Sequence, residues 1–173
     1  MHTSQLVNVL GATALAVTEL VDASVTRPAH TSSSGAAALA VLLQTGPLGV
    51  TELGKRVGLT QPAAARMVDA LERSGQVERT RRGRTVHTDL TRAGRRSART
   101  LLRDRSRELG GLVDGLSAEE QEALTRLLGK VVTNVHARVQ DANRICRLCD
   151  RAECVSELPR CPVGLAAGEE PGA

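Results

Sequence analysis

The sequence contains no phenylalanine, tyrosine or tryptophan, and only 2 of its 173 residues are methionine. The hydrophobic core must therefore be built mainly from Leu, Val and Ala side chains, each of which buries less area than an aromatic ring. The lack of aromatic platforms argues against recognition of RNA or single strands by base stacking. A thin aliphatic core also favours helices and favours burial of further surface against a partner subunit.

The sequence also lacks the motifs of common enzyme classes. It has no Ser-His-Asp order, no phosphate-binding loop and no paired acid–base constellation, so we expect a protein that is not an enzyme. No targeting segment is convincing, because no Lys or Arg precedes the apolar stretch 6–17, which is too short to span a membrane. We expect this stretch to be an assembly helix in a cytoplasmic protein that has no membrane partner.

Positive charge is concentrated in one part of the chain. Residues 55–108 hold 15 Lys or Arg and 6 Asp or Glu, a local net charge of +9, whereas the rest of the chain has a net charge of −5. A charge run is usually a solvated helix face. Here it coincides with a helix-turn-helix pattern, and a basic segment confined to one motif indicates a site for a polyanion.

The stretch 50–84 has the pattern of two short helices, a tight turn and a basic hairpin. Its spacing predicts a first helix over 51–57, capped by Thr51, and a turn at Gly58. Thr60 is expected to cap the second helix. The apolar residues of this second helix recur at i, i+3, i+4 and i+7, which predicts one buried stripe of Ala64, Met67, Val68 and Leu71.

A small wing and flanking helices complete the expected secondary structure. Two strands are expected over 76–80 and 85–90, joined by the arginine-rich turn 81–84. Further helices are expected over 4–23, 32–43 and 91–113, with a break at 26–30 where Pro28 lies. Ser117 and Glu120 form a capping box for a last helix. This helix has an apolar stripe of Leu124, Leu127, Leu128, Val131 and Val135.

The second helix of the motif carries the candidate base contacts. Because one of its faces is buried, its N-terminal polar residues can reach base edges in the major groove. An Arg can bind guanine bidentately, and a Gln can bind adenine. The wing is too short to have a core, which favours phosphate or minor-groove contacts by its arginines. The predicted DNA contacts are Thr60, Gln61, Ala63, Arg66, Arg79, Arg81, Arg82 and Arg84.

From about residue 39 to residue 128, the chain resembles the MarR family of winged-helix regulators. The resemblance lies in VTELGKRVGL at 50–59, ARMVDALE at 65–72, GQVER at 75–79, LTRAG at 90–94 and LSAEE at 116–120. It implies a homodimer with interleaved terminal helices that binds a pseudo-palindromic operator in double-stranded DNA. The wing departs from the family pattern, because 81–87 lacks the usual acidic partner for an arginine. The family's ligands are often aromatic acids, but no polar cluster marks such a pocket here.

All four cysteines lie within sixteen residues, with the spacing C-x2-C-x4-C-x6-C: Cys146, Cys149, Cys154 and Cys161. The first hypothesis is a zinc site, because four thiolates can complete a tetrahedral set of ligands. An iron–sulfur cluster is the alternative cofactor, although the intervals differ from ferredoxin runs. A metal-free thiol sensor is a third reading, and four unrelated reduced cysteines are the fourth. Structural disulfides are not expected in a cytoplasmic chain.

Together, these observations predict a mainly α fold with a small β-wing. The expected parts are a dimerisation helix (1–30), a winged helix-turn-helix lobe (31–95), further dimerisation helices (96–142), a cysteine cluster (143–164) and a disordered tail (165–173). The expected function is that of a homodimeric, sequence-specific transcriptional regulator, a repressor in the first instance, which responds to metal or redox state. The alternatives are a small-molecule-responsive regulator with a purely structural cysteine site, and a winged-helix protein-interaction module.

Overall fold

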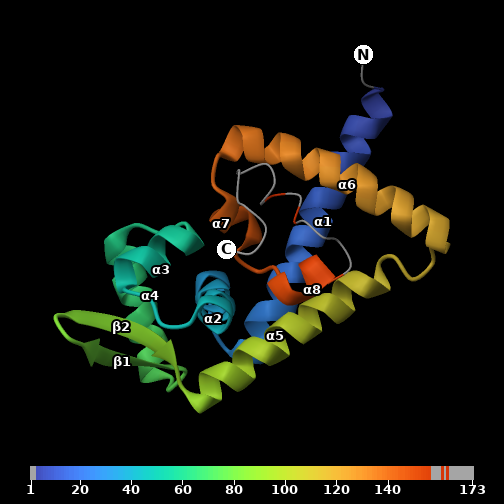
Figure 1. Ribbon diagram of the computed structural model, residues 1–173. Coiled ribbons are helices and arrows are strands. Elements are labelled where there is room, and N and C mark those ends of the chain that lie inside the picture. Colours follow the sequence, from blue (N-terminus) through green and yellow to red (C-terminus); the bar gives the residue numbers. More distant parts are fainter. Residues whose placement is uncertain (1–2, 157–160, 162, 164–173) are drawn as a thin grey trace.

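The computed structural model describes residues 3–156, 161 and 163 and has the expected mainly α fold with a small two-stranded wing (Figure 1). The expected tail at 165–173 lies outside the described residues. In chain order the elements are α1 (Ser4–Ala29), α2 (Ser33–Thr45), α3 (Val50–Val57), α4 (Gln61–Arg73), β1 (Val77–Arg82), β2 (Thr85–Leu90), α5 (Arg92–Gly111), α6 (Ala118–Val139), α7 (Ala142–Cys146) and α8 (Arg151–Ser156).

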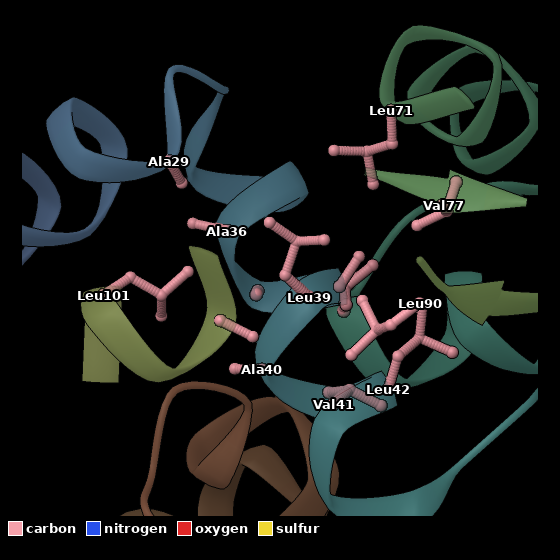
Figure 2. Close-up of a cluster of buried hydrophobic side chains, with 14 of the residues drawn as sticks. Ala29, Ala36, Leu39, Ala40, Val41, Leu42, Leu71, Val77, Leu90 and Leu101 are labelled. Atoms are coloured by element: carbon pink, nitrogen blue, oxygen red, sulfur yellow. The ribbon is translucent and has the colours of Figure 1, made fainter. Parts of the chain in front are cut away.

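Helix α2 lies at the centre of the hydrophobic core. Residues 35–42 are all buried, and four of these eight positions are alanines that are completely inaccessible to solvent. Such small side chains let α1, α3 and α5 pack directly on α2. Figure 2 shows Leu39 and Leu42 pointing toward α4 and the wing, while Ala36 and Ala40 lie nearer to α1 and α5. The core is therefore aliphatic, as the composition required.

Helix α1 continues through Pro28, so the predicted break at 26–30 is wrong. The helix ends only where His30 takes a left-handed conformation with φ 46°, and the His30 N–H donates to the Arg27 carbonyl over 3.2 Å. Val25 and Ala29, on either side of the proline, are buried in the core. Tertiary burial on both sides thus outweighs the local cost of a proline in the last turn.

The length of α1 also corrects the expectation that the N-terminal apolar stretch is too short to cross a membrane. The helix has 26 residues, and by length and composition alone it could span a bilayer. Its C-terminal residues Val25 and Ala29 nevertheless belong to the core, and α1 packs along α5. The described structure therefore uses at least the last turns of this helix as part of the protein interior.

Several other helix ends follow the sequence closely, with small shifts. The Ser117 capping box is confirmed: the Ser117 N–H donates to Glu120 Oε2 over 2.9 Å, and the Glu120 N–H donates to Ser117 Oγ over 3.3 Å. The N-cap of α3, by contrast, is Gly49 and not Thr51. Strand β1 extends two residues further than expected, to Arg82, so that only Gly83 and Arg84 form the turn.

Candidate nucleic-acid interface and cysteine segment

The helix-turn-helix is held together by a close contact between α3 and α4. A Cβ atom added at Gly54 would lie 2.7 Å from the Cβ of Ala64, so only glycine permits this approach. Gly58 ends α3 with φ +76°, a left-handed conformation that turns the chain toward α4. The predicted stripe of α4 is confirmed, because its buried residues are Ala64, Met67, Val68 and Leu71.

This burial leaves the N-terminal end of α4 facing solvent. Thr60 is the N-cap residue, as expected, but its side chain makes no capping hydrogen bond. Gln61 and Arg66 are exposed, and Ala63 is half-buried. The first N–H groups of a helix carry a partial positive charge and bind anions such as phosphate. Three of the predicted contacts, Thr60, Gln61 and Arg66, are therefore accessible near the N-terminal end of α4, and Ala63 is partly covered.

The wing is a hairpin in which β1 and β2 pair antiparallel from Val77↔Leu90 to Arg82↔Thr85. Its base is widened by a bridge to Leu48, whose N–H donates to the Thr88 carbonyl over 3.1 Å. In Figure 1 the wing projects from the molecule beside α4, at the end opposite α6.

The predicted wing contacts occupy different positions on this hairpin. Arg81 belongs to β1 and not to the turn, and it is exposed, with its Nε donating to the Gly83 carbonyl over 3.3 Å. Arg84 is exposed in the two-residue turn. The side chain of Arg82 lies outside the described residues. The hairpin thus presents at least two arginines beside the exposed face of α4.

Arg79 connects the wing to α4. Its Nη2 lies 2.5 Å from Asp69 Oδ1, and its Nη1 pairs with Glu72 Oε2. The hydrogen bond to Asp69 is the main cause of the raised pKa of Arg79. The sequence reasoning missed this contact, although two carboxylates three residues apart on α4 were a signal for it. A direct contact between Arg79 and DNA stays a prediction, and a phosphate would compete with these two carboxylates.

Two helices away from the wing present apolar side chains to solvent. Helix α6 buries none of its residues in the single chain, and Leu127 and Leu128 are each 51% exposed. The N-terminal half of α1 has the same character, with Leu15 72% exposed. The other large exposed residues of the two helices are Leu6, Val7, Val9, Leu10, Val131, Val135 and Val139. Solvated helices rarely keep such continuous apolar faces.

The four predicted cysteines are free thiols, and each is half-buried. The Cys154 thiol shares hydrogen bonds with Cys149 and Cys161, and the charge of Cys146 acts on Cys149. Burial raises the pKa of Cys149. Burial, followed by the charges of Cys149 and Cys161, raises the pKa of Cys154 to about 12. Cys154 therefore lies beside Cys149 and Cys161, but over residues 3–156, 161 and 163 no group of three His, Cys, Asp or Glu is arranged to hold a metal ion.

Residues from α2 and α5 interact with this cysteine segment, which we define as residues 142–154 together with Cys161. Gln44 of α2 donates from Nε2 to the Cys149 carbonyl over 2.8 Å and accepts at Oε1 from the Arg151 N–H over 3.1 Å. Arg105 of α5 lowers the pKa of Cys149 through its charge, and its buried Nε has no hydrogen-bond partner within the described structure. The sequence reasoning missed Gln44 and Arg105, because sequence spacing does not reveal contacts across more than 40 residues.

Comparisons with known proteins agree with this geometry. The MarR family model matches residues 32–84, which run from the start of α2 to the wing tip. An uncharacterized HTH-type transcriptional regulator of Bacillus subtilis, YwhA, is 27% identical over 109 residues, which cover 61% of this chain and 78% of that protein.

Solved structures give the same result for the fold. A MarR family protein from Bacillus stearothermophilus is 27% identical with a TM-score of 0.67, and the match covers 76% of this chain and 94% of that one. MepR, a transcription regulator of the Staphylococcus aureus multidrug efflux pump MepA, is 19% identical with a TM-score of 0.61, over 78% and 99% of the two chains. Residues 32–84 thus match the MarR winged helix-turn-helix, and the chain is similar in fold to MarR-type transcriptional regulators.

Proposed function

We propose that the chain acts as a homodimer that binds a pseudo-palindromic operator in double-stranded DNA in the cytoplasm. The observation that carries this proposal is the exposed N-terminal face of α4 beside an arginine-tipped wing, within a segment of net charge +9. A repressor is the simplest form of such a regulator, because a dimer seated on an operator blocks access to the promoter.

The exposed residues suggest a division of labour on the DNA. Gln61 and Arg66 on α4 are suited to base edges in the major groove, and Thr60 is suited to a phosphate at the helix N-terminus. Arg81, Arg82 and Arg84 are suited to the backbone or minor groove beside it. Base contacts would set the sequence preference, and phosphate contacts would supply most of the salt-dependent affinity.

The apolar faces of α1 and α6 support the homodimer. A two-fold axis beside these helices would bury both faces and leave each wing pointing away from the axis. In a helix-turn-helix dimer, the two recognition helices must lie about 34–36 Å apart to reach successive major grooves. The same burial would supply the surface that the thin monomer core lacks.

We also propose that Cys146, Cys149, Cys154 and Cys161 form a metal or redox centre, with zinc ahead of an iron–sulfur cluster. The contacts of Cys154 with Cys149 and Cys161 support this, as does the positive charge of Arg105 beside them. Thiolates are the zinc ligands, and Arg105 would offset part of their negative charge. A zinc ion would draw the thiols into a tetrahedron with Zn–S distances near 2.3 Å.

Operator selection from random duplexes, followed by fluorescence anisotropy on the selected and a scrambled duplex, tests the DNA proposal. We expect a selected site with two-fold symmetry, bound by one dimer, and an affinity that falls steeply with salt. Failure to enrich any symmetric site, with salt-independent binding, would favour the protein-interaction module. Metal analysis of protein purified without oxygen tests the cysteine proposal. One colourless ion per chain is expected for zinc, whereas a brown sample indicates iron–sulfur.

A further inference from the structure

The cysteine segment lies against the helix-turn-helix of its own chain. Helix α7 follows directly on α6 and packs against α3 (Figure 1). Arg144 of α7 covers Gly58, because a Cβ added at that glycine would lie 3.4 Å from both Cδ and Nε of Arg144. Gly58 is the left-handed residue that turns the chain from α3 toward α4. The segment therefore touches the residue on which the angle between these two helices depends.

A second attachment holds the other half of the segment. Gln44 binds the backbone on both sides of Asp150, between Cys149 and Cys154. The side-chain amide of Gln44 thus hydrogen-bonds both a backbone carbonyl and a backbone N–H of the cysteine segment. Leu148, between Cys146 and Cys149, adds an apolar contact with the hydrophobic core. The contacts of Gln44 and Leu148 are made by backbone and side chains that lie between cysteines. We expect these contacts to change when the thiols are moved apart.

We propose that the cysteine segment is a strap that holds the helix-turn-helix in place, so that the chemical state of the thiols controls the position of α4. The regulatory consequence rests on the proposed DNA-binding function. When the thiols stay together, through a metal or through their mutual contacts, Gln44 and Arg144 keep their partners. When the thiols are forced apart, both attachments are lost, and the turn at Gly58 gains freedom that DNA binding must then remove.

Alkylation of the full-length protein provides the test, because it separates the thiols whether or not a metal is present. Protein is treated with a chelator and then with N-ethylmaleimide until mass spectrometry shows four adducts per chain. Hydrogen exchange is followed in peptides covering 44–60, without DNA, and operator affinity is measured separately. We expect alkylation to accelerate exchange and weaken binding by a factor of about 5–30, which corresponds to one or two lost hydrogen bonds.

The double variant Gln44→Leu/Arg144→Ala removes the attachments and leaves the cysteines intact. We expect it to exchange quickly over 44–60 before alkylation, and to show little further change after it. Asn143→Ala is the matched control, because Asn143 is exposed on the same short helix. This control should respond as the wild type does.

The outcomes separate the strap from the function on which it rests. If the hydrogen-exchange rate of wild-type peptides covering 44–60 is the same before and after alkylation, the strap proposal is wrong. It is also wrong if alkylation accelerates exchange in the double variant as much as in the wild type. Faster exchange with unchanged operator affinity overturns its regulatory role. If the wild type binds no DNA, the DNA proposal fails, and the exchange measurement still decides whether the strap exists.

Discussion

Two arginines of the candidate interface should have different roles. Arg84 is exposed in the wing turn, and its proposed partner is a phosphate, so Arg84→Ala should weaken binding to operator and random DNA equally and lower the salt slope of log affinity by about one. Arg82→Ala should behave in the same way. Arg66→Ala should cost about 1–3 kcal/mol on the operator and much less on random DNA. Anisotropy titrations over a salt series measure both effects, and identical profiles for the Arg66 and Arg84 variants would contradict these roles.

The thiol of Cys154 should be the least reactive thiol that the structure identifies. Its pKa is raised from 9.0 to about 12, because burial and the neighbouring Cys149 and Cys161 disfavour the thiolate. At pH 8 the thiolate fraction is then much lower than for an ordinary thiol, and alkylation of Cys154 in the metal-free protein should be correspondingly slow. Peptide mapping of iodoacetamide adducts over time measures this rate, with urea-unfolded protein as the control.

The direction of this shift also fixes the pH dependence of metal binding. Since a thiol with a raised pKa keeps its proton at neutral pH, zinc must displace that proton when it binds. The apparent zinc affinity should therefore rise with pH across the range 6 to 9. A competition assay with a chromophoric chelator follows this rise, and an affinity independent of pH would contradict zinc binding by these thiols, because ordinary thiols also release a proton to zinc in this range.

At the scale of elements, the double ion pair of Arg79 joins the wing to the recognition helix. These side chains are partly exposed, so replacing Asp69 and Glu72 by Asn and Gln should lower the free energy of unfolding by less than about 1 kcal/mol. The same change should loosen the wing and leave the Arg79 guanidinium free for phosphate. We expect urea unfolding to change little, while hydrogen exchange in 77–90 accelerates. Unchanged exchange in the wing would mean that the pairing to Leu48 alone holds it.

Elements with a local signal were predictable from the sequence, and elements decided by distant contacts were not. The stripe of α4 and the capping box of Ser117 depend on residues within one or two turns, and the structure confirms both. Pro28 predicted a break in the first helix, yet burial of Val25 and Ala29 keeps α1 intact. The attachment of the cysteine segment to Gln44 spans 105 residues, and no spacing in the sequence encodes it.

At the scale of the whole molecule, the exposed apolar faces of α1 and α6 are the interface of the proposed dimer. Both faces belong to helices that flank the DNA-binding lobe, and the cysteine segment starts where α6 ends. A dimer formed through these faces would place the strap between the two-fold axis and the helix-turn-helix. The stability of the protein should then depend on its concentration, because burial at the interface contributes to folding.

Val131→Glu tests this dependence. Val131 is 37% exposed in the single chain, and a carboxylate there would be buried without a partner in the proposed interface, at a cost of several kcal/mol. The dimer and the fold should fail together, because so thin a monomer core is marginal. Val86→Glu is the matched control, since Val86 is 50% exposed on the wing, away from both helices. Sedimentation velocity and circular dichroism should show a native dimer for this control. A folded monomer of Val131→Glu, or a native dimer that tolerates it, would refute an interface built on α6.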